Sequence, residues 1–292
     1  MSDRNGQPGT RVAVVTGGGS GIGRATVLRL LASGYRVVVA DVNAETAAAT
    51  AGLAEAPERV AVAAVDVRDE DAVAAAMATA VDRFGGLSAV VNNAGVGGAF
   101  GAITTIESED WDYTFDVLVR GVFYGVKHGA RVMQAQGGGG SIVNVASVAG
   151  LTGGLGPVPY SAAKAAVVNF TKAVSIELAA DRIRVNAVCP GAISTPLVHH
   201  GRPERAEDKL AATQPWPDHG RAEHIASAVA FLAGDESEFV TGEALVVDGG
   251  LTAAGPGPAF AERLGNDPRL RGMSGVNYGT TGVPSVVRNR EG

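Results

Sequence analysis

Ser147, Tyr160 and Lys164 are side chains whose types and spacing could move a proton at an alcohol oxygen. Lys164 follows Tyr160 by one helical turn, so a helix here puts both on one face. A free phenol has a pKa of about 10 and is a poor base at neutral pH, but a nearby ammonium favours the phenolate. Ser147 could hold the substrate oxygen beside Tyr160. The three residues therefore predict general acid–base catalysis at a carbinol or carbonyl oxygen.

A glycine-rich segment, Thr16–Gly23, follows an apolar run directly and opens an alanine- and leucine-rich segment. Gly17 suits a tight turn, Gly21 lets backbone approach a pyrophosphate, and Gly23 lets a helix pack closely on a sheet. The N-terminus of that helix favours phosphate groups. A glycine-rich turn without a ligand is the alternative. Next to the proton-transfer residues, the segment predicts a dinucleotide loop, and hence hydride transfer between a nicotinamide and an alcohol or ketone.

Polar residues that end later apolar runs extend the predicted cofactor site. Asp41 is placed to accept hydrogen bonds from adenosine ribose hydroxyls, and its charge would repel a 2′-phosphate. No Arg or Lys stands at Val42 or in the glycine loop, so NAD(H) is expected rather than NADP(H). Asp66 and Val67 could hold the adenine edge. The segment Asn92–Gly95 offers amide groups near the other ribose.

Short β-branched runs alternate with longer alanine-rich ones along most of the chain. Continuous apolar strands are expected where helices cover both faces of a parallel sheet. The pattern predicts an α/β fold: a single Rossmann-type, doubly wound, parallel seven-stranded sheet with helices on both faces. The expected strands are 12–15, 36–40, 60–65, 89–92, 141–145, 184–188 and 244–247. The expected helices are 22–33, 44–54, 70–84, 109–134, 161–180 and 222–233.

The composition narrows the class of protein. The chain has 292 residues, 46% of them hydrophobic and 18% charged, with a net charge of −6, which is typical of a soluble globular protein. Without a block of basic residues, neither a nucleic acid nor an anionic membrane surface is an expected partner.

No early apolar run resembles a signal peptide, so a cytoplasmic location is expected. Cys189 is the single cysteine, expected to be a buried thiol. His199 and His200 are adjacent, a poor spacing for chelation, so no metal site is expected.

Taken together, these motifs resemble the short-chain dehydrogenase/reductase family over residues 11–252. The resemblance implies that Tyr160 is the acid/base, that Lys164 binds the nicotinamide ribose, and that Ile193 and Thr195 lie against the carboxamide. It also implies a homotetramer or homodimer. The matching motifs are Thr16–Gly23, Asp66, Asn92–Gly95, Ser147, Tyr160 with Lys164, Asn186, Pro190 with Gly191, and Asp248–Gly250. The expected cofactor-binding residues are Gly17, Gly19, Ser20, Gly21, Ile22, Gly23, Asp41, Val42, Asp66, Val67, Asn93, Ala94, Gly95, Tyr160, Lys164, Pro190, Gly191, Ile193 and Thr195.

Leu118 departs from the family pattern, which usually has Asn at this position. That Asn helps to hold a water that links the lysine to bulk solvent, and leucine has no hydrogen-bonding group. On a helix, Thr114 is one turn back and is the nearby polar candidate, whereas Asp116 and Arg120 point elsewhere. We therefore expect activity with an altered proton relay. A weakly active or non-catalytic NAD(H)-binding or redox-sensing protein is the competing reading.

The substrate wall is expected from residues 96–106, 148–158 and 192–216, and the middle segment is apolar and uncharged. An anionic substrate would want a fixed Arg or Lys there, so a neutral, hydrophobic alcohol or ketone is favoured. Segments 116–133 and 153–172 are similar to a family branch that includes plant secoisolariciresinol and xanthoxin dehydrogenases, which implies a cyclic substrate. An NADP-dependent ketoacyl reductase is a further alternative, disfavoured by Asp41.

Both ends of the chain differ in composition from the middle. Residues 1–10 are polar and are expected to form a flexible tail before the catalytic domain of residues 11–252. Residues 253–292 hold 8 Gly and 4 Pro, typical of irregular chain. Spaced apolar residues such as Phe260, Leu264 and Leu270 predict that this extension packs on a neighbouring subunit or beside the substrate opening.

Overall fold

The computed structural model describes residues 11–199, 203–254, 273–276 and 286–289. The chain divides into two units, Met1–Gly250 and Leu251–Gly292. The expected tail of residues 1–10, His200 and the apolar residues Phe260, Leu264 and Leu270 lie outside the described residues. In the second unit, β10 (Met273–Val276) pairs antiparallel with β11 (Val286–Asn289).

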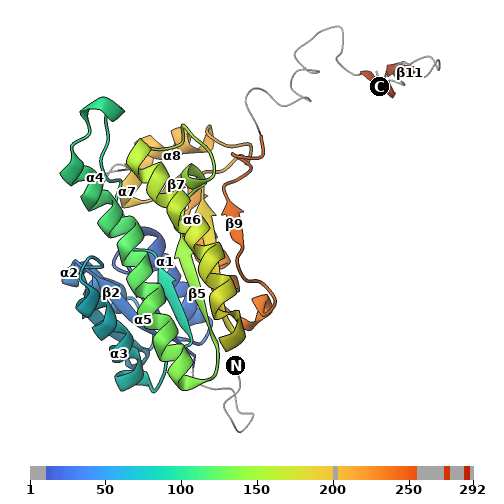
Figure 1. Cartoon of the computed structure of the whole chain (residues 1–292). Coiled ribbons are helices and arrows are strands. Elements are labelled where there is room, and N and C mark those ends of the chain that lie inside the picture. The colour runs from blue at the N-terminus through green and yellow to red at the C-terminus, as the bar shows by residue number, and fades with distance from the viewer. Residues whose placement is uncertain (1–10, 200–202, 255–272, 277–285, 290–292) are drawn as a thin grey trace. The chain divides into compact units, whose positions relative to one another are not determined.

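The first unit is built on a parallel seven-stranded sheet, as the sequence predicts, with strand order β3-β2-β1-β4-β5-β6-β9 (Figure 1). The order reverses between β1 and β4, so the crossovers run outward in both directions from the middle of the sheet. The strands are β1 (Val12–Thr16), β2 (Arg36–Asp41), β3 (Val60–Ala64), β4 (Ala89–Asn92), β5 (Gly140–Val145), β6 (Ile183–Pro190) and β9 (Ala244–Val247).

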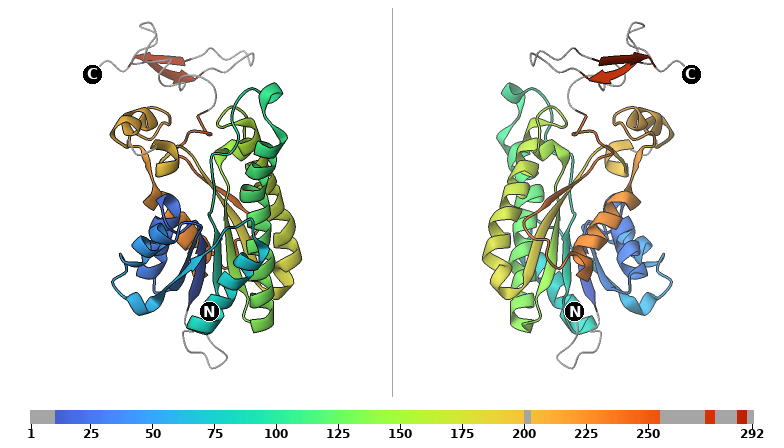
Figure 2. Two further views of the ribbon diagram at one scale, coloured as in Figure 1. Left: turned by 90° about the vertical axis from the view of Figure 1, so that its left-hand side faces the viewer. Right: turned by 90° about the vertical axis from the view of Figure 1, so that its right-hand side faces the viewer.

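Helices cover both faces of this sheet, with α1, α2 and α9 on one face and α3, α5 and α6 on the other (Figure 2). Strands β1 and β5 are therefore buried along their whole length, which is why they lack the alternation of half-exposed strands. The α-helices are α1 (Gly21–Ala32), α2 (Ala44–Ala51), α3 (Glu70–Phe84), α4 (Ser108–Phe115), α5 (Gly121–Gln136), α6 (Val158–Leu178), α7 (Pro196–His199), α8 (Pro203–Ala211) and α9 (Ala222–Ala233).

Shorter elements join these helices and strands. Strand β7 (Ile193–Ser194) pairs in parallel with β8 (Gly220–Arg221), so the segment between them leaves the sheet and returns beside its own start. Helices α7 and α8 lie in that segment, above the end of β6. The 3₁₀ turns are η1 (Pro57–Arg59), η2 (Ile103–Thr105), η4 (Val148–Gly150), η5 (Ala179–Asp181) and η6 (Asp235–Ser237).

The single helix predicted over residues 109–134 is wrong in one respect, because the observed helix is interrupted. Between α4 and α5 lies a π-helical segment, η3 (Asp116–Arg120), in which the Gly121 N–H donates to the Asp116 carbonyl five residues earlier. Such single π turns insert one residue into a helix and are frequent at functional sites. Leu118 lies at the centre of this segment and is fully buried. Periodicity alone did not reveal the extra residue.

Candidate active site

The glycine loop joins β1 to α1 at the carboxyl end of the sheet, and its glycines are required by close contacts. Gly17 has φ +64°, and a Cβ on it would lie 2.7 Å from the Ala94 Cα. A Cβ on Gly23 would lie 1.9 Å from the Gly17 carbonyl oxygen, so α1 packs against the loop itself. The Asn93 amide donates to the Thr16 and Gly17 carbonyl oxygens at 3.0 and 3.1 Å. The loop is thus fixed with the N-terminus of α1 open to an anion.

Asp41 ends β2 with both carboxylate oxygens held by backbone N–H groups. The Gly19 N–H donates to one oxygen at 2.8 Å, and the Asn43 N–H donates to the other at 2.9 Å. A fixed negative charge therefore stands beside the glycine loop. This is the arrangement that suits ribose hydroxyls and opposes a phosphate at the same place.

One cavity of about 340 Å³ runs from Asp41 past the glycine loop to Tyr160, a volume in the range of small-ligand sites. Among the predicted site residues, all but Gly19 and Gly23 line it. These two glycines instead support the residues that do line it. The Gly19 N–H donates to Asp41, and Gly23 packs against Gly17. The residues that line the cavity outside the predicted catalytic and cofactor set are Val65, Arg68, Val96, Tyr113, Val117, Val145, Ala146, Pro196, Leu197 and Val198.

The predicted proton-transfer residues come together at one end of this cavity. Ser147 follows β5, Tyr160 lies in the first turn of α6, and Lys164 lies one turn later on the same face. The Ser147 side chain hydrogen-bonds to the Tyr160 hydroxyl and also accepts the Ala149 N–H at 3.1 Å. The Lys164 ammonium donates to the Val145 carbonyl oxygen at 2.7 Å, and its Nζ lies 5.6 Å from the centre of the Tyr160 ring.

Burial controls the protonation of this group. It raises the pKa of Tyr160, an effect that the hydrogen bond from Ser147 offsets in part. It also lowers the pKa of Lys164 to about 8, because the ammonium is almost completely removed from water. In the protein alone Lys164 is not among the groups that shift the pKa of Tyr160, so the prediction that the ammonium and a positively charged nicotinamide together favour the phenolate stays a prediction. The ammonium is directed to Val145, and its own charge is strongly disfavoured.

Leu118 lies beside the lysine. A Cβ built on Gly95 would lie 3.4 Å from the Leu118 Cδ2 and 4.0 Å from the Lys164 Nζ, so the three residues share one corner of the interior. The proposal that Thr114 supplies the missing polar group is wrong. Its hydroxyl donates to the Asp110 carbonyl at 2.7 Å and accepts the Ala99 N–H at 2.9 Å. Its one proton is therefore used within α4, and its oxygen, by accepting the Ala99 N–H, ties the predicted substrate wall to that helix.

Asp116, Arg120 and Cys189 behave as the sequence predicts. Asp116 and Arg120 form an ion pair with each other at 2.8 Å, one turn apart. Cys189 is a buried thiol whose pKa burial raises to about 11, so it stays protonated at neutral pH. Among the described residues, no cluster of three or more His, Cys, Asp or Glu side chains has the geometry to hold a metal ion.

The wall predicted for the substrate has an apolar rim in the structure. Exposed large side chains come from each of the three predicted segments: Phe100, Ile103, Leu151, Leu155, Val158, Leu197, Val198 and Trp216. Of these, Leu197 and Val198 line the cavity, and exposed apolar surface at a cavity is typical of a ligand or partner site. Within the described residues, no helix combines the length and apolar character that a membrane crossing requires.

Comparison with known proteins agrees with this geometry. A family model described as Enoyl-(Acyl carrier protein) reductase matches residues 17–252. The chain is 43% identical to cis-4-hydroxycyclohexanecarboxylate dehydrogenase of Sinomonas cyclohexanicum, over 83% of this chain and 97% of that protein. It is 41% identical to (+)-borneol dehydrogenase 2 of Salvia officinalis, over 83% of this chain and 89% of that protein.

The solved structure of levodione reductase matches with a TM-score of 0.78 and 36% identity, over 84% of this chain and 99% of that one. Sequence, sheet order and relatives therefore agree. The chain belongs to the short-chain dehydrogenase/reductase family and is an oxidoreductase of the class that acts on CH–OH groups.

Proposed function

We propose that the protein interconverts a hydrophobic, cyclic secondary alcohol and its ketone with NAD(H). The observation that carries this proposal is the convergence of Ser147, Tyr160 and Lys164 on one cavity that also holds the Asp41 carboxylate. The exposed apolar side chains of Leu197 and Val198, which line that cavity, support a hydrophobic substrate. The ring alcohols named for two of the relatives support a cyclic one.

The residues fit a dinucleotide. A helix N-terminus without acidic residues in its first turn stands beside glycines that leave room for a pyrophosphate, and Asp41 stands where an adenosine ribose would lie. The cofactor-binding set that we propose is the one the sequence predicts. When bound, the nicotinamide would supply the two-electron chemistry, taking or giving a hydride at the substrate carbon.

The side chains of this protein would handle the proton. Ser147 would hold the substrate oxygen by a hydrogen bond, next to the Tyr160 hydroxyl to which it is already bonded. In alcohol oxidation Tyr160 would take the hydroxyl proton as a general base, and in ketone reduction it would give that proton back. Because burial raises the pKa of Tyr160, the positive charge of the oxidised nicotinamide would act with Lys164 to stabilise the phenolate.

Asp41 supports the choice of NAD(H). Both of its oxygens are held in place, so the charge cannot turn away from a 2′-phosphate without breaking two backbone hydrogen bonds. An NADP-dependent ketoacyl reductase would need a cation in that position. For the same reason the ratio of NAD(H) to NADP(H) affinity separates the two possibilities.

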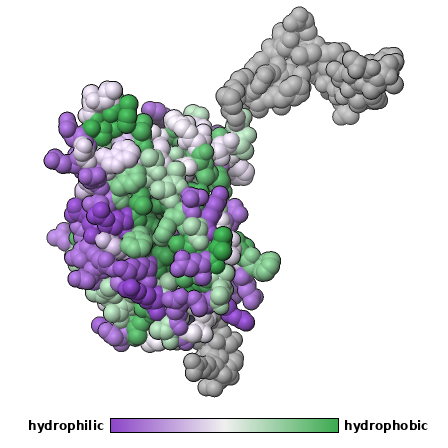
Figure 3. All heavy atoms as spheres, viewed as in Figure 1, coloured by the Kyte–Doolittle hydropathy of each residue, from purple (hydrophilic) through white to green (hydrophobic). Residues whose placement is uncertain are grey.

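Exposed apolar residues on α5, α6, α9 and β9 support assembly as a homotetramer or homodimer. They include Phe123 of α5, Ile176 of α6, Phe231 of α9 and Val246 of the edge strand β9. Figure 3 shows apolar surface over α5 and α6. Such faces are unfavourable in water unless a partner covers them. Light scattering coupled to size-exclusion chromatography gives the assembly mass and tests this point.

A screen of alcohols tests the function. Cyclohexanol, borneol, a linear secondary alcohol of equal carbon number and a carboxylated ring alcohol are offered with NAD+ and with NADP+, and absorbance of the reduced cofactor is followed. We expect turnover with NAD+ and the neutral ring alcohols, and none in Tyr160→Phe. Tight NADH binding without turnover on the whole panel would instead favour a sensing protein.

A further inference from the structure

Arg68 is a cavity residue that neither the family motifs nor the proposed chemistry uses. It follows β3 and shares the Asp41 end of the cavity with Tyr113 of α4. Its guanidinium grips Asp66, with Nε 3.1 Å from both carboxylate oxygens and Nη2 2.6 Å from one of them. The centre of the guanidinium also lies 5.2 Å from the centre of the Tyr113 ring. Arg68 is thus held between a carboxylate and an aromatic ring.

The ion pair with Arg68 occupies hydrogen-bonding positions on the Asp66 carboxylate. Besides the guanidinium, the Arg68 backbone N–H donates to the same carboxylate at 3.0 Å. Arg68 therefore satisfies both oxygens, and it also holds the pKa of Asp66 below its usual range. The sequence predicts that Asp66 binds the adenine edge. In the structure the planar guanidinium lines this side of the cavity together with the carboxylate that it binds.

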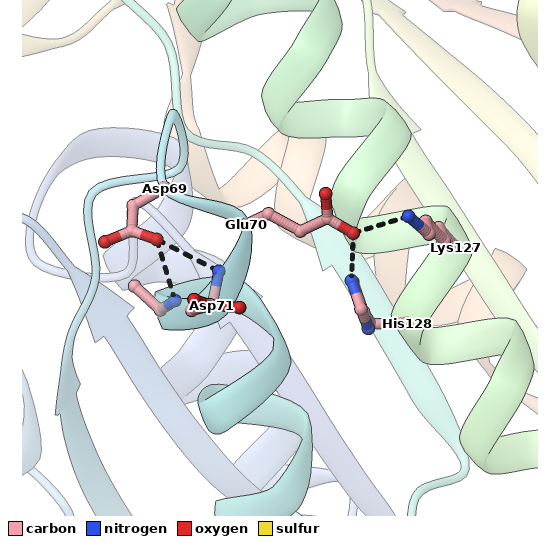
Figure 4. A network of polar contacts seen from close by, with 6 residues as sticks. Asp69, Glu70, Asp71, Lys127 and His128 are labelled. Atoms are coloured by element: carbon pink, nitrogen blue, oxygen red, sulfur yellow. Dashed lines mark hydrogen bonds and ion pairs between the residues drawn. The ribbon is translucent and has the colours of Figure 1, made fainter.

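The loop that carries Arg68 is fixed from both sides. Asp69 caps α3 by accepting the Asp71 and Ala72 N–H groups at 3.0 and 3.3 Å. Glu70 binds Lys127 at 2.5 Å and His128 at 3.0 Å, both on α5 (Figure 4). Figure 4 shows the cap and the two ion pairs on successive residues of the same turn. A group on such a loop loses little freedom when a ligand binds, which favours affinity.

The surroundings indicate the shape of the ligand on this side. Val42, Val65, Val67 and Val117 line the same end of the cavity with apolar side chains, and Asp41 stands beside them. A flat ring attached to a ribose suits this combination. A phosphate does not, because the charge of Arg68 is already neutralised by Asp66. A guanidinium face in contact with an aromatic ring is a favourable cation–π arrangement.

We propose that Arg68 binds the adenine ring of the dinucleotide through its guanidinium plane, with Asp66 and Tyr113 positioning that plane. The inference rests on the proposed function in one respect, namely that a dinucleotide occupies the cavity. It differs from edge recognition by Asp66, because stacking tolerates any flat purine and edge recognition requires the adenine amino group. Asp66, a member of the proposed cofactor-binding set, is also a positioning residue for Arg68.

Calorimetric binding tests the proposal. Dissociation constants are measured for NADH, for AMP and for deamino-NADH, in which hypoxanthine replaces adenine. We expect Arg68→Ala to weaken all three by about three- to ten-fold, the range of a single cation–π contact. Arg68→Lys keeps the charge without the plane and should behave as Arg68→Ala. The native protein should bind deamino-NADH within about two-fold of NADH, because the ring face is unchanged.

Matched variants of Tyr113 complete the test. Tyr113→Phe keeps the aromatic face and should leave the three constants unchanged, whereas Tyr113→Leu should weaken them. Unchanged NADH affinity in Arg68→Ala would overturn the proposal, and so would much weaker binding of deamino-NADH to the native protein. A larger loss for NADPH than for NADH would also overturn it, in favour of a phosphate site. If NADH binds but no alcohol is oxidised, the proposed function fails while this inference stands.

Discussion

The Lys164 ammonium donates to the carbonyl oxygen of Val145, the last residue of β5, at 2.7 Å, inside a nearly dry corner of the protein. A carbonyl oxygen offers only a partial charge, so it does not compensate for the loss of water around the cation. This is the physical reason that the pKa of Lys164 falls to about 8. The protein thus carries an electrostatic cost at a residue of the proposed catalytic group.

Replacing Lys164 by Met should stabilise the protein and abolish turnover. The lowered pKa of Lys164 corresponds to an unfavourable free energy on the order of 3 kcal/mol at neutral pH, which the substitution removes. The Val145 carbonyl then loses its hydrogen-bond donor, and this loss offsets part of the gain. The melting temperature of the protein without cofactor should therefore rise by roughly 2–6 °C. Lys172→Met, which removes an exposed lysine of the same helix, is the control and should change it little. A lower melting temperature in Lys164→Met would contradict this account.

The stability gain of Lys164→Met should depend on pH. The folded-state pKa, about 8, lies below the ordinary value of 10.5. Between these two values the unfolded chain binds more protons than the folded one, so the native protein gains stability as pH rises. The difference in free energy of unfolding between the native protein and the variant should have its largest value at pH 7 and should shrink as pH rises toward 10.5. Urea unfolding at pH 7 and pH 9.5 measures it, and a constant difference would show that the lysine is not responsible.

Replacing Leu118 by Asn should change the pH profile of turnover. The new amide would lie beside Lys164 and Gly95, where leucine now leaves no hydrogen-bonding group. We expect several-fold faster turnover at low pH, at a cost of about 1–3 kcal/mol for burying a polar side chain. Leu118→Met keeps the volume and polarity and serves as the control. An unchanged rate and profile in Leu118→Asn would remove any special role of this position.

Replacing Asp41 by Asn should weaken the preference for NAD(H). The amide keeps one oxygen to accept a backbone N–H, but it removes the charge that opposes a 2′-phosphate. The ratio of NADP(H) to NAD(H) affinity should rise at least ten-fold, about 1.4 kcal/mol. Asp82→Asn, an exposed charge on α3, is the control. If the ratio does not move, cofactor choice is set by another part of the cavity.

The sequence is sufficient to predict the sheet, because each strand is a short, mostly β-branched run and these runs alternate with helical segments along the chain. It also predicts which residues line the cavity, because parallel strands bring their carboxyl ends to one edge. What it does not predict depends on side-chain geometry. Thr114 accepts the Ala99 N–H and Lys164 donates to the Val145 carbonyl, and both hydrogen bonds join residues that are well separated in the chain. The ion pair of Arg68 with Asp66 is local, but it depends on the side-chain conformation of Arg68.

The π turn at Asp116–Arg120 has a consequence for how this stretch of chain could vary. Because one surplus residue sets the angular offset between α4 and α5, shortening the stretch by a single position would rotate everything before it by about 100°. Trp111 and Tyr113 would then exchange their present neighbours for solvent or for the sheet. Point changes here should be tolerated according to size and polarity, whereas a one-residue deletion should misalign the whole opening to the catalytic groups.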